Sequence, residues 1–169
     1  IMNDIIKKAS DVPSLTGQDL ASLASTNEVY RWEEGPLNLA GEEVSPLSKK
    51  YTVVVYDYGI KFNILRLLVE RECSVIVVPA KTKPSVALSY NPDGIFFSNG
   101  PGDPEPCEYA IDAIQEFSKL KIPLFGICLG YQLMALAFGG RTKKMKFGHH
   151  GANHPVKELQ SGKVLITSQ

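Results

Sequence analysis

Residues 124–130 read Leu124-Phe125-Gly126-Ile127-Cys128-Leu129-Gly130, and apolar residues at helical spacing follow them at positions 133, 136 and 137. The apolar run predicts a buried strand, and the spacing after it predicts a helix. A Gly-x-Cys-x-Gly pattern at such a junction has the layout of a nucleophile elbow, with sulfur in place of oxygen. Small residues permit the sharp turn, and a helix N-terminus favours the thiolate. The pattern therefore predicts Cys128 as a nucleophile; the alternative is a buried structural cysteine between two packing glycines.

The same alternation of apolar strand and helix runs through the chain from Tyr51 onward. Continuous apolar runs occupy residues 52–56, 74–78, 94–98 and 124–127, and a pattern compatible with a helix follows each of them. Strands that are apolar throughout imply a parallel sheet covered on both faces. We therefore expect an α/β fold with an open, mainly parallel sheet and helices on both faces. Functional sites in such folds lie at the carboxyl ends of the strands, which directs attention to residues 57–59, 99–106 and 128–130.

One of these loops is rich in glycine and proline and reads Ser98-Asn99-Gly100-Pro101-Gly102-Asp103-Pro104. A rigid turn of this composition exposes backbone amides, which could hold an anion or an oxyanion. The alternative is an ordinary strand-to-helix connection. A Walker loop is excluded because no Gly-Lys-Ser/Thr follows. The amide of Leu129, in the first turn of its helix, is a second candidate oxyanion donor.

Composition excludes several classes of protein. The chain has 169 residues, and its 18 Lys and Arg balance its 18 Asp and Glu, so no electrostatic argument favours a nucleic-acid partner. Three cysteines argue against a disulfide scaffold and fit a reducing compartment. Residues 122–140 carry no formal charge, but Pro123, Gln132 and four glycines favour a strand, turn and helix over a membrane span.

Residues before Tyr51 have a different character. Thr16, with Asp19 three residues later, predicts a helix start, and residues 28–32 could form a strand. Residues 33–50 have the glycine, proline and charge content of a linker. The chain begins with Ile and ends in a β-like run at residues 164–169. We therefore expect it to be an internal piece of a longer polypeptide.

The remaining cysteines and the histidines are weaker candidates for catalytic or metal-binding roles. Cys73 is expected to fill the core, and Cys107 lies near a helix start where exposure is possible. His149, His150 and His154 lack a helical frame and a nearby thiol or carboxylate, so no metal site is expected. None of the three follows an expected strand of the parallel sheet. The visible chain thus offers a nucleophile and oxyanion donors without a convincing general base.

Residues 98–104 and 126–132 resemble the class I, or triad, glutamine amidotransferases. Three further segments narrow the resemblance to the family of small, glutaminase subunits of carbamoyl phosphate synthases. They are Tyr56-Asp57-Tyr58-Gly59-Ile60-Lys61-Phe62-Asn63-Ile64-Leu65-Arg66, Asn91-Pro92-Asp93-Gly94-Ile95 and Lys146-Phe147-Gly148-His149-His150-Gly151-Ala152-Asn153-His154-Pro155-Val156. The resemblance runs from about Pro13 to Gln169. It implies a flavodoxin-like amidotransferase domain at 51–169, C-terminally incomplete, with 1–47 as the end of the family's N-terminal domain plus linker.

The resemblance also implies a chemistry. Cys128 would attack the side-chain amide of glutamine, form a γ-glutamyl thioester and release ammonia. The amides of Gly100 and Leu129 would form the oxyanion hole, and glutamine would contact Gly100, Gly102, Leu129 and Gln132. Ammonia would pass through a tunnel to a large synthetase subunit, which makes carbamoyl phosphate for arginine and pyrimidine synthesis. No metal or cofactor is implied here, because ATP and Mg²⁺ bind the large subunit; the protein is expected in the cytoplasm, with no nucleic-acid or membrane partner.

The chain departs from the family at several points, and two of them bear on catalysis. The family's catalytic His and Glu lie in a His-Pro-Glu segment downstream of the last residue, so they are not in this chain. The isolated chain is therefore expected to lack efficient glutaminase activity. Tyr131 occupies a place where this subunit usually has His.

Three alternatives remain open from the sequence. The same chemistry could serve another synthetase, such as those making anthranilate, aminodeoxychorismate, GMP or CTP, although residues 149–154 argue against these. A γ-glutamyl hydrolase or an intracellular cysteine peptidase could share the elbow. A non-catalytic module that binds a partner is supported by the missing base and weakened by the intact elbow around Cys128.

Overall fold

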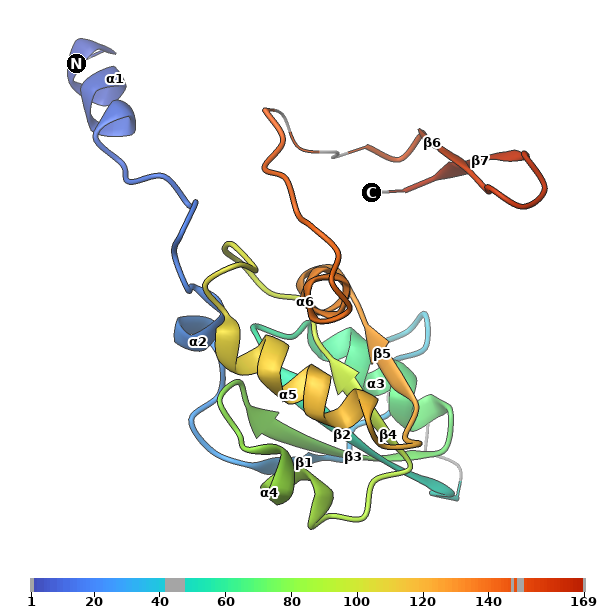
Figure 1. The fold of residues 1–169 in the computed structure, drawn as a ribbon. Coiled ribbons are helices and arrows are strands. Elements are labelled where there is room, and N and C mark those ends of the chain that lie inside the picture. The colour runs from blue at the N-terminus through green and yellow to red at the C-terminus, as the bar shows by residue number, and fades with distance from the viewer. Residues whose placement is uncertain (1, 42–47, 147, 149–150, 169) are drawn as a thin grey trace.

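The computed structural model describes residues 2–41, 48–146, 148 and 151–168, and Figure 1 shows the course of the chain. In chain order the elements are α1 (Met2–Ser10), α2 (Ala21–Ala24), β1 (Tyr30–Trp32), β2 (Tyr51–Asp57), α3 (Phe62–Glu70), β3 (Cys73–Pro79), α4 (Pro84–Leu88), β4 (Gly94–Phe97), α5 (Glu108–Ser118), β5 (Leu124–Gly126), α6 (Leu129–Ala137), β6 (His154–Lys157) and β7 (Val164–Thr167).

The main sheet has five strands in the order β1-β3-β2-β4-β5. The four strands expected from the apolar runs pair in parallel, and β2 lies between β3 and β4. β1 is added at the edge, antiparallel to β3, with Tyr30 opposite Val77. The mainly parallel α/β sheet predicted from the sequence is confirmed. Since the four strands run in one direction, their carboxyl ends and the loops that follow lie along one edge.

Helices cover both faces of this sheet, as expected. On one face α5 and α6 pack on the side chains of Val54, Tyr56 and Phe97. On the other face α3 packs on Val55 and on neighbouring residues of β3. Alternate residues of β2 thus enter two separate apolar clusters. This explains why the strand is apolar throughout instead of alternating with polar residues.

The residues before β2 are attached to the sheet by β1 and α2. Ala21, the first residue of α2, is fully buried in the cluster under α5 and α6. The predicted helix start at Thr16 is wrong, because α2 begins at Ala21 and the Asp19 carboxylate accepts the Ser22 amide at 3.0 Å. Part of the predicted linker, residues 42–47, lies outside the described residues. The assignment of 1–47 to a separate domain stays a prediction.

Two parts of the chain stand away from the sheet in Figure 1, namely α1 and the hairpin of β6 and β7. The hairpin pairs His154 with Thr167 and Lys157 with Val164. The β-like run expected near the end of the sequence is its second strand. In the described part of the chain, no helix has both the length and the apolar character that crossing a membrane requires.

Phe117 tests the core beneath α5. Its ring is fully buried and meets the ring of Tyr56 edge-on at 5.9 Å. We expect Phe117→Ala to reduce the free energy of unfolding by about 3–5 kcal/mol, because the deletion leaves a cavity. Urea denaturation measures this, with Phe138→Ala as the matched control, since Phe138 is 62% exposed. Equal losses in the two variants would contradict the packing described for α5.

Candidate active site

Cys128 occupies the turn between β5 and α6, where it is the N-cap of the helix. Its backbone has φ 53° and ψ −110°, a conformation that residues with a side chain rarely adopt. The side chain is exposed. Strain of this kind, held at a strand-to-helix turn, is a feature of a nucleophile elbow. The alternative of a buried structural cysteine is wrong.

The two glycines beside this turn are required by close packing. A Cβ at Gly126 would lie 2.6 Å from the carbonyl carbon of Gly130. A Cβ at Gly130 would lie 2.1 Å from the carbonyl oxygen of Phe97, at the end of β4. Neither backbone atom can move aside without shifting a strand or a helix. The Gly-x-Cys-x-Gly spacing therefore lets α6 start directly against the end of β4.

The loop after β4 is fastened to both neighbouring loops through Ser98. Its buried hydroxyl accepts the amide of Tyr58 at 2.9 Å, and its carbonyl accepts the amide of Gly130 at 3.0 Å. Asn99 continues the connection, because its side-chain amide donates to the Gly59 carbonyl at 2.9 Å. The loops after β2, β4 and β5 are thus held together by hydrogen bonds at the carboxyl edge of the sheet.

Gly100 and Leu129, the predicted oxyanion donors, are brought into contact. A Cβ at Gly100 would lie 2.9 Å from Leu129 Cδ2 and 2.2 Å from the Tyr58 carbonyl oxygen, so this position also needs glycine. Among the hydrogen bonds of the described residues, neither amide donates to another group of the chain. An oxyanion hole needs two such uncommitted amides, and one of them, that of Leu129, directly follows the exposed Cys128 in the chain. Their binding of an oxyanion stays a prediction.

The other two predicted glutamine contacts are placed differently. Gln132 is exposed one turn along α6, and its amide donates to the Cys128 carbonyl at 3.0 Å. Gly102 has φ 94°, and a Cβ there would lie 3.0 Å from the Gln18 carbonyl oxygen. Gly102 therefore packs against the segment before α2. Glutamine binding by Gly102 and Gln132 stays a prediction.

Asp57 begins one of the three loops singled out from the sequence, but the sequence assigned it no role at this edge. It is one of the two buried polar residues among those described, the other being Ser98. One oxygen accepts the amides of Gly59 and Ile60 at 2.8 and 2.9 Å, and the other accepts the Thr26 amide at 2.7 Å. The sequence signal for this role was a charged residue at the end of an otherwise apolar strand, because a buried carboxylate needs hydrogen-bond donors.

Cys73 and Cys107 differ from Cys128 in their surroundings. Cys73 starts β3 and is buried, as expected, and its burial raises the pKa of the thiol. The sequence left open that Cys107 is exposed, but the side chain is fully buried. Its thiol lies 3.6 Å from Asp19 Oδ1, and burial is the main cause that raises its pKa to about 11.

No metal centre is found among the described residues. His149 and His150 lie outside the described residues, so the predicted absence of a metal site at the histidine cluster is not tested there. His154 starts β6, which stands away from the junction of β5 and α6 in Figure 1. The described residues place no histidine at the elbow.

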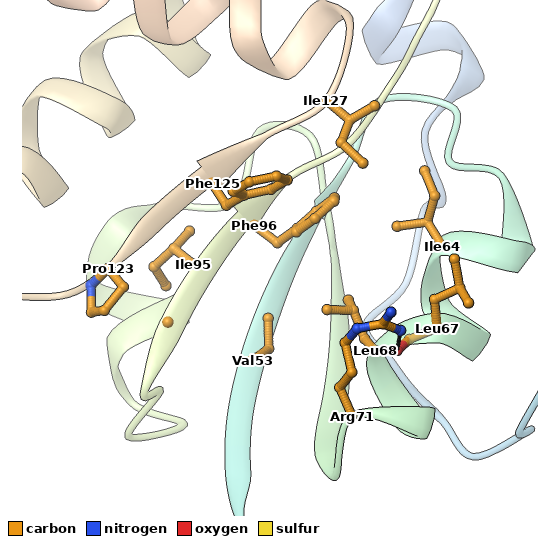
Figure 2. A pocket seen from close by; sticks show the side chains of 11 residues that line it. Val53, Ile64, Leu67, Leu68, Arg71, Ile95, Phe96, Pro123, Phe125 and Ile127 are labelled. Atoms are coloured by element: carbon orange, nitrogen blue, oxygen red, sulfur yellow. Dashed lines mark hydrogen bonds between the residues drawn. The ribbon is translucent and has the colours of Figure 1, made fainter. Parts of the chain in front are cut away.

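A hollow of about 500 Å³ opens on the opposite, α3 face of the sheet, beside β4 and β5 (Figure 2). Its lining is apolar apart from the side chain of Arg71. The described residues around it are Val53, Ile64, Leu67, Leu68, Arg71, Gly94, Ile95, Phe96, Pro123, Phe125 and Ile127. It lacks the convergent polar groups that would orient an amide and an α-carboxylate. The candidate site is therefore the carboxyl edge around Cys128 and not this hollow.

A parallel α/β sheet with a strained cysteine at a strand-to-helix turn defines the class, and comparison with known families agrees. The model of the glutamine amidotransferase class-I family matches residues 54–169, and the chain belongs to this family. Carbamoyl phosphate synthase small chains are similar over nearly the whole chain. The protein from Xanthomonas campestris is 56% identical over 164 residues, which cover 97% of this chain and 44% of that protein. The one from Buchnera aphidicola is 58% identical over 96% of this chain and 43% of its own length.

The chain thus spans less than half the length of these curated relatives. A solved structure of similar fold is a putative GMP synthase protein from Thermoplasma acidophilum. Its TM-score is 0.55 at 25% identity, covering 66% of this chain and 56% of that one. The structural likeness agrees with the family assignment.

The three thiols should differ sharply in reactivity. At pH 8 we expect iodoacetamide to modify Cys128 in the native protein, while Cys73 and Cys107 react only after denaturation. The reason is that both are buried, and a pKa near 11 leaves Cys107 almost entirely protonated at pH 8. Intact mass followed by peptide mapping measures the sites. Native modification of Cys107 as fast as that of Cys128 would contradict the geometry.

The strain at Cys128 should be measurable as stability. We expect Cys128→Gly to unfold with a free energy about 1 kcal/mol higher than Cys128→Ala, because glycine accepts a positive φ without penalty. Ala135→Gly, within α6, is the control and should destabilise by about 1 kcal/mol, since its backbone is an ordinary helix. Urea denaturation of the three variants decides the matter. A Gly variant at 128 that is less stable than the Ala variant would show that the turn is unstrained.

Proposed function

We propose that this chain supplies the nucleophile and the oxyanion donors of a glutamine-hydrolysing site that delivers ammonia to a synthetase making carbamoyl phosphate. The observation that supports this most directly is the exposed, strained Cys128, followed by Leu129, whose side chain lies against Gly100. No described residue offers an acceptor to the amides of Gly100 and Leu129. The names of the similar small chains support the choice of product.

In the first half-reaction, the Cys128 thiolate attacks the carboxamide carbon of glutamine. The C–S bond forms while the carbonyl π electrons move onto oxygen, where the amides of Gly100 and Leu129 donate to the oxyanion. As the oxyanion collapses, the C–N bond breaks. A proton from a general acid reaches the nitrogen, which departs as ammonia and leaves a γ-glutamyl thioester on Cys128.

In the second half-reaction, water adds to the thioester carbon and the C–S bond breaks, which gives glutamate and free Cys128. A general base must take the proton of the water, and His is the usual choice beside a cysteine nucleophile. We assign this base, and the Glu that orients it, to residues of the longer protein outside this chain. The coverage of less than half of each similar small chain supports that assignment.

The ammonia would pass through a tunnel to a large synthetase subunit. ATP and Mg²⁺ would bind that subunit, and this chain would need no cofactor of its own. The product would serve arginine and pyrimidine synthesis in the cytoplasm. A glutaminase serving GMP synthesis is the second candidate, supported by the fold of the Thermoplasma protein. The identity of 56–58% to small chains, against 25% to that protein, favours carbamoyl phosphate.

The test compares the full-length protein, assembled with its synthetase, with the isolated 169-residue chain. We expect the assembly to release ammonia from glutamine and to form carbamoyl phosphate, and we expect Cys128→Ser to reduce both rates by at least about a thousandfold. The isolated chain should show no efficient glutaminase activity, because we assign the general base to residues outside it. A coupled glutamate dehydrogenase assay measures the ammonia.

Two results would count against the proposal. Rapid, Cys128-dependent ammonia release from the isolated chain would show that the base lies within these residues. Glutamine-dependent formation of GMP, with no carbamoyl phosphate, would support the second candidate function, a glutaminase serving GMP synthesis. Cys73→Ser serves as the matched control, because Cys73 is a buried thiol and its replacement should leave the catalytic rate unchanged.

A further inference from the structure

Residues 17–26, here called the N-terminal strap, lie along the carboxyl edge of the sheet and contact the segments that follow β3, β2 and β4. The Ser25 hydroxyl accepts the amide of Ala80, after β3, at 2.8 Å. The Thr26 amide donates to Asp57, at the end of β2, at 2.7 Å. At its other end the strap meets the loop after β4. Three neighbouring strand ends are thus joined to a single segment that comes from far earlier in the sequence.

Asp103 makes the connection to the glycine-rich loop. Its carboxylate accepts the Gly17 amide at 2.8 Å, and its own amide donates to the Gln18 carbonyl at 3.3 Å. The second carboxylate oxygen accepts the Glu105 amide at 3.1 Å, within the loop itself. Asp103 therefore fixes the strap on one side and the loop's own backbone on the other.

Gly102, which contacts the strap, lies only two positions after Gly100, the predicted oxyanion donor. Gly102 approaches the strap so closely that a Cβ would lie 3.0 Å from the Gln18 carbonyl oxygen. Gly100, two residues earlier, packs on the Tyr58 carbonyl and on Leu129. Pro101, between the two glycines, limits backbone rotation. Movement of the strap at Gln18 would therefore displace the amide of Gly100.

Asp19 anchors the middle of the strap. It accepts the Tyr109 hydroxyl of α5 at 3.0 Å and the Ser22 hydroxyl at 2.7 Å, and Lys81 Nζ lies 3.7 Å away. The strap is thereby held on α5 as well as on the loop. Its position is determined by several separate elements, as a fixed support for a loop requires.

We propose that Asp103 is a positioning residue for glutamine hydrolysis: by binding the N-terminal strap it holds the Gly100 amide where it can donate to the oxyanion on the Cys128 adduct. The inference rests on the function proposed above and deepens it, because it makes a segment before the matched amidotransferase residues part of the catalytic support. The donor geometry is needed in the transition state, so loss of the contact should lower kcat more than it changes KM.

Asp93 provides a matched control at the opposite edge of the sheet. Its carboxylate accepts the Thr52 amide at 2.7 Å, and its own amide donates to the Thr52 carbonyl at 2.7 Å. The chemistry of the contact is the same as at Asp103, but Asp93 precedes β4 whereas Asp103 follows it. A merely structural role would affect the two positions alike.

The experiment uses the full-length protein assembled with its synthetase and the variants Asp103→Ala, Asp103→Asn, Asp93→Ala and Asp93→Asn. We expect Asp103→Ala to lower kcat for glutamine about ten- to a hundredfold, because a small displacement of a catalytic group has effects of that size, with KM changed less than about threefold. Asp103→Asn retains one carbonyl oxygen to accept the amides of Gly17 and Glu105, so its kcat should lie between those of the wild type and Asp103→Ala. Both Asp93 variants should keep kcat within about twofold.

Hydrogen exchange and the melting temperature are measured on the same samples. We expect faster exchange over residues 98–107 in Asp103→Ala, with the remainder of the protein unchanged and Tm close to that of the Asp93 variants. An unchanged kcat in Asp103→Ala overturns the inference, as does an equal loss of kcat in Asp93→Ala. If the wild-type protein lacks glutaminase activity, the proposed function fails by itself. The strap is then judged by exchange alone: faster exchange confined to 98–107 supports it, and unchanged exchange overturns it.

Discussion

The structure depends on a contact in which there is no room for a side chain. The first turn of α6 meets the end of β4 so closely that a Cβ at Gly130 would lie 2.1 Å from the Phe97 carbonyl oxygen. This approach lets the Gly130 amide donate to the Ser98 carbonyl at 3.0 Å. It brings the turn that carries Cys128 beside the loop that carries Gly100. The same close packing of α6 on β4 therefore also assembles the candidate site.

Below this edge the protein is held by apolar packing, and at the edge by hydrogen bonds to backbone groups. Strands β2 and β4 send alternate side chains into two buried apolar clusters. At the carboxyl edge, Asp57 and Ser98 accept the amides of neighbouring loops. Such bonds are directional, so they fix the position of a loop more narrowly than apolar contact does. The proposed oxyanion site would need backbone amides held in such fixed positions.

Much of the fold could be predicted from local patterns. The four parallel strands and their helices follow from apolar runs and spacing, because these report burial on both faces of a sheet. The elbow at Cys128 was recognisable because its glycines are within two residues of it. The burial of Cys107 and the true start of α2 were not predicted. Asp19 lies near both: it accepts the Tyr109 hydroxyl across a sequence separation of 90 residues, its Oδ1 lies 3.6 Å from the Cys107 thiol, and it accepts the Ser22 amide in the first turn of α2.

The sequence by itself determined the class of fold, the elbow that carries Cys128 and the two glycine-rich turns, since each is set by residues that are neighbours in the chain. Only the tertiary structure decided what surrounds them. Residues 17–26 lie across the strand ends because Asp57 and Asp103 accept their amides, and nothing in the local pattern of either segment indicates the other. The physical reason is that a hydrogen bond between residues 86 positions apart depends on chain topology, whereas strand and helix periodicity depends on the local backbone.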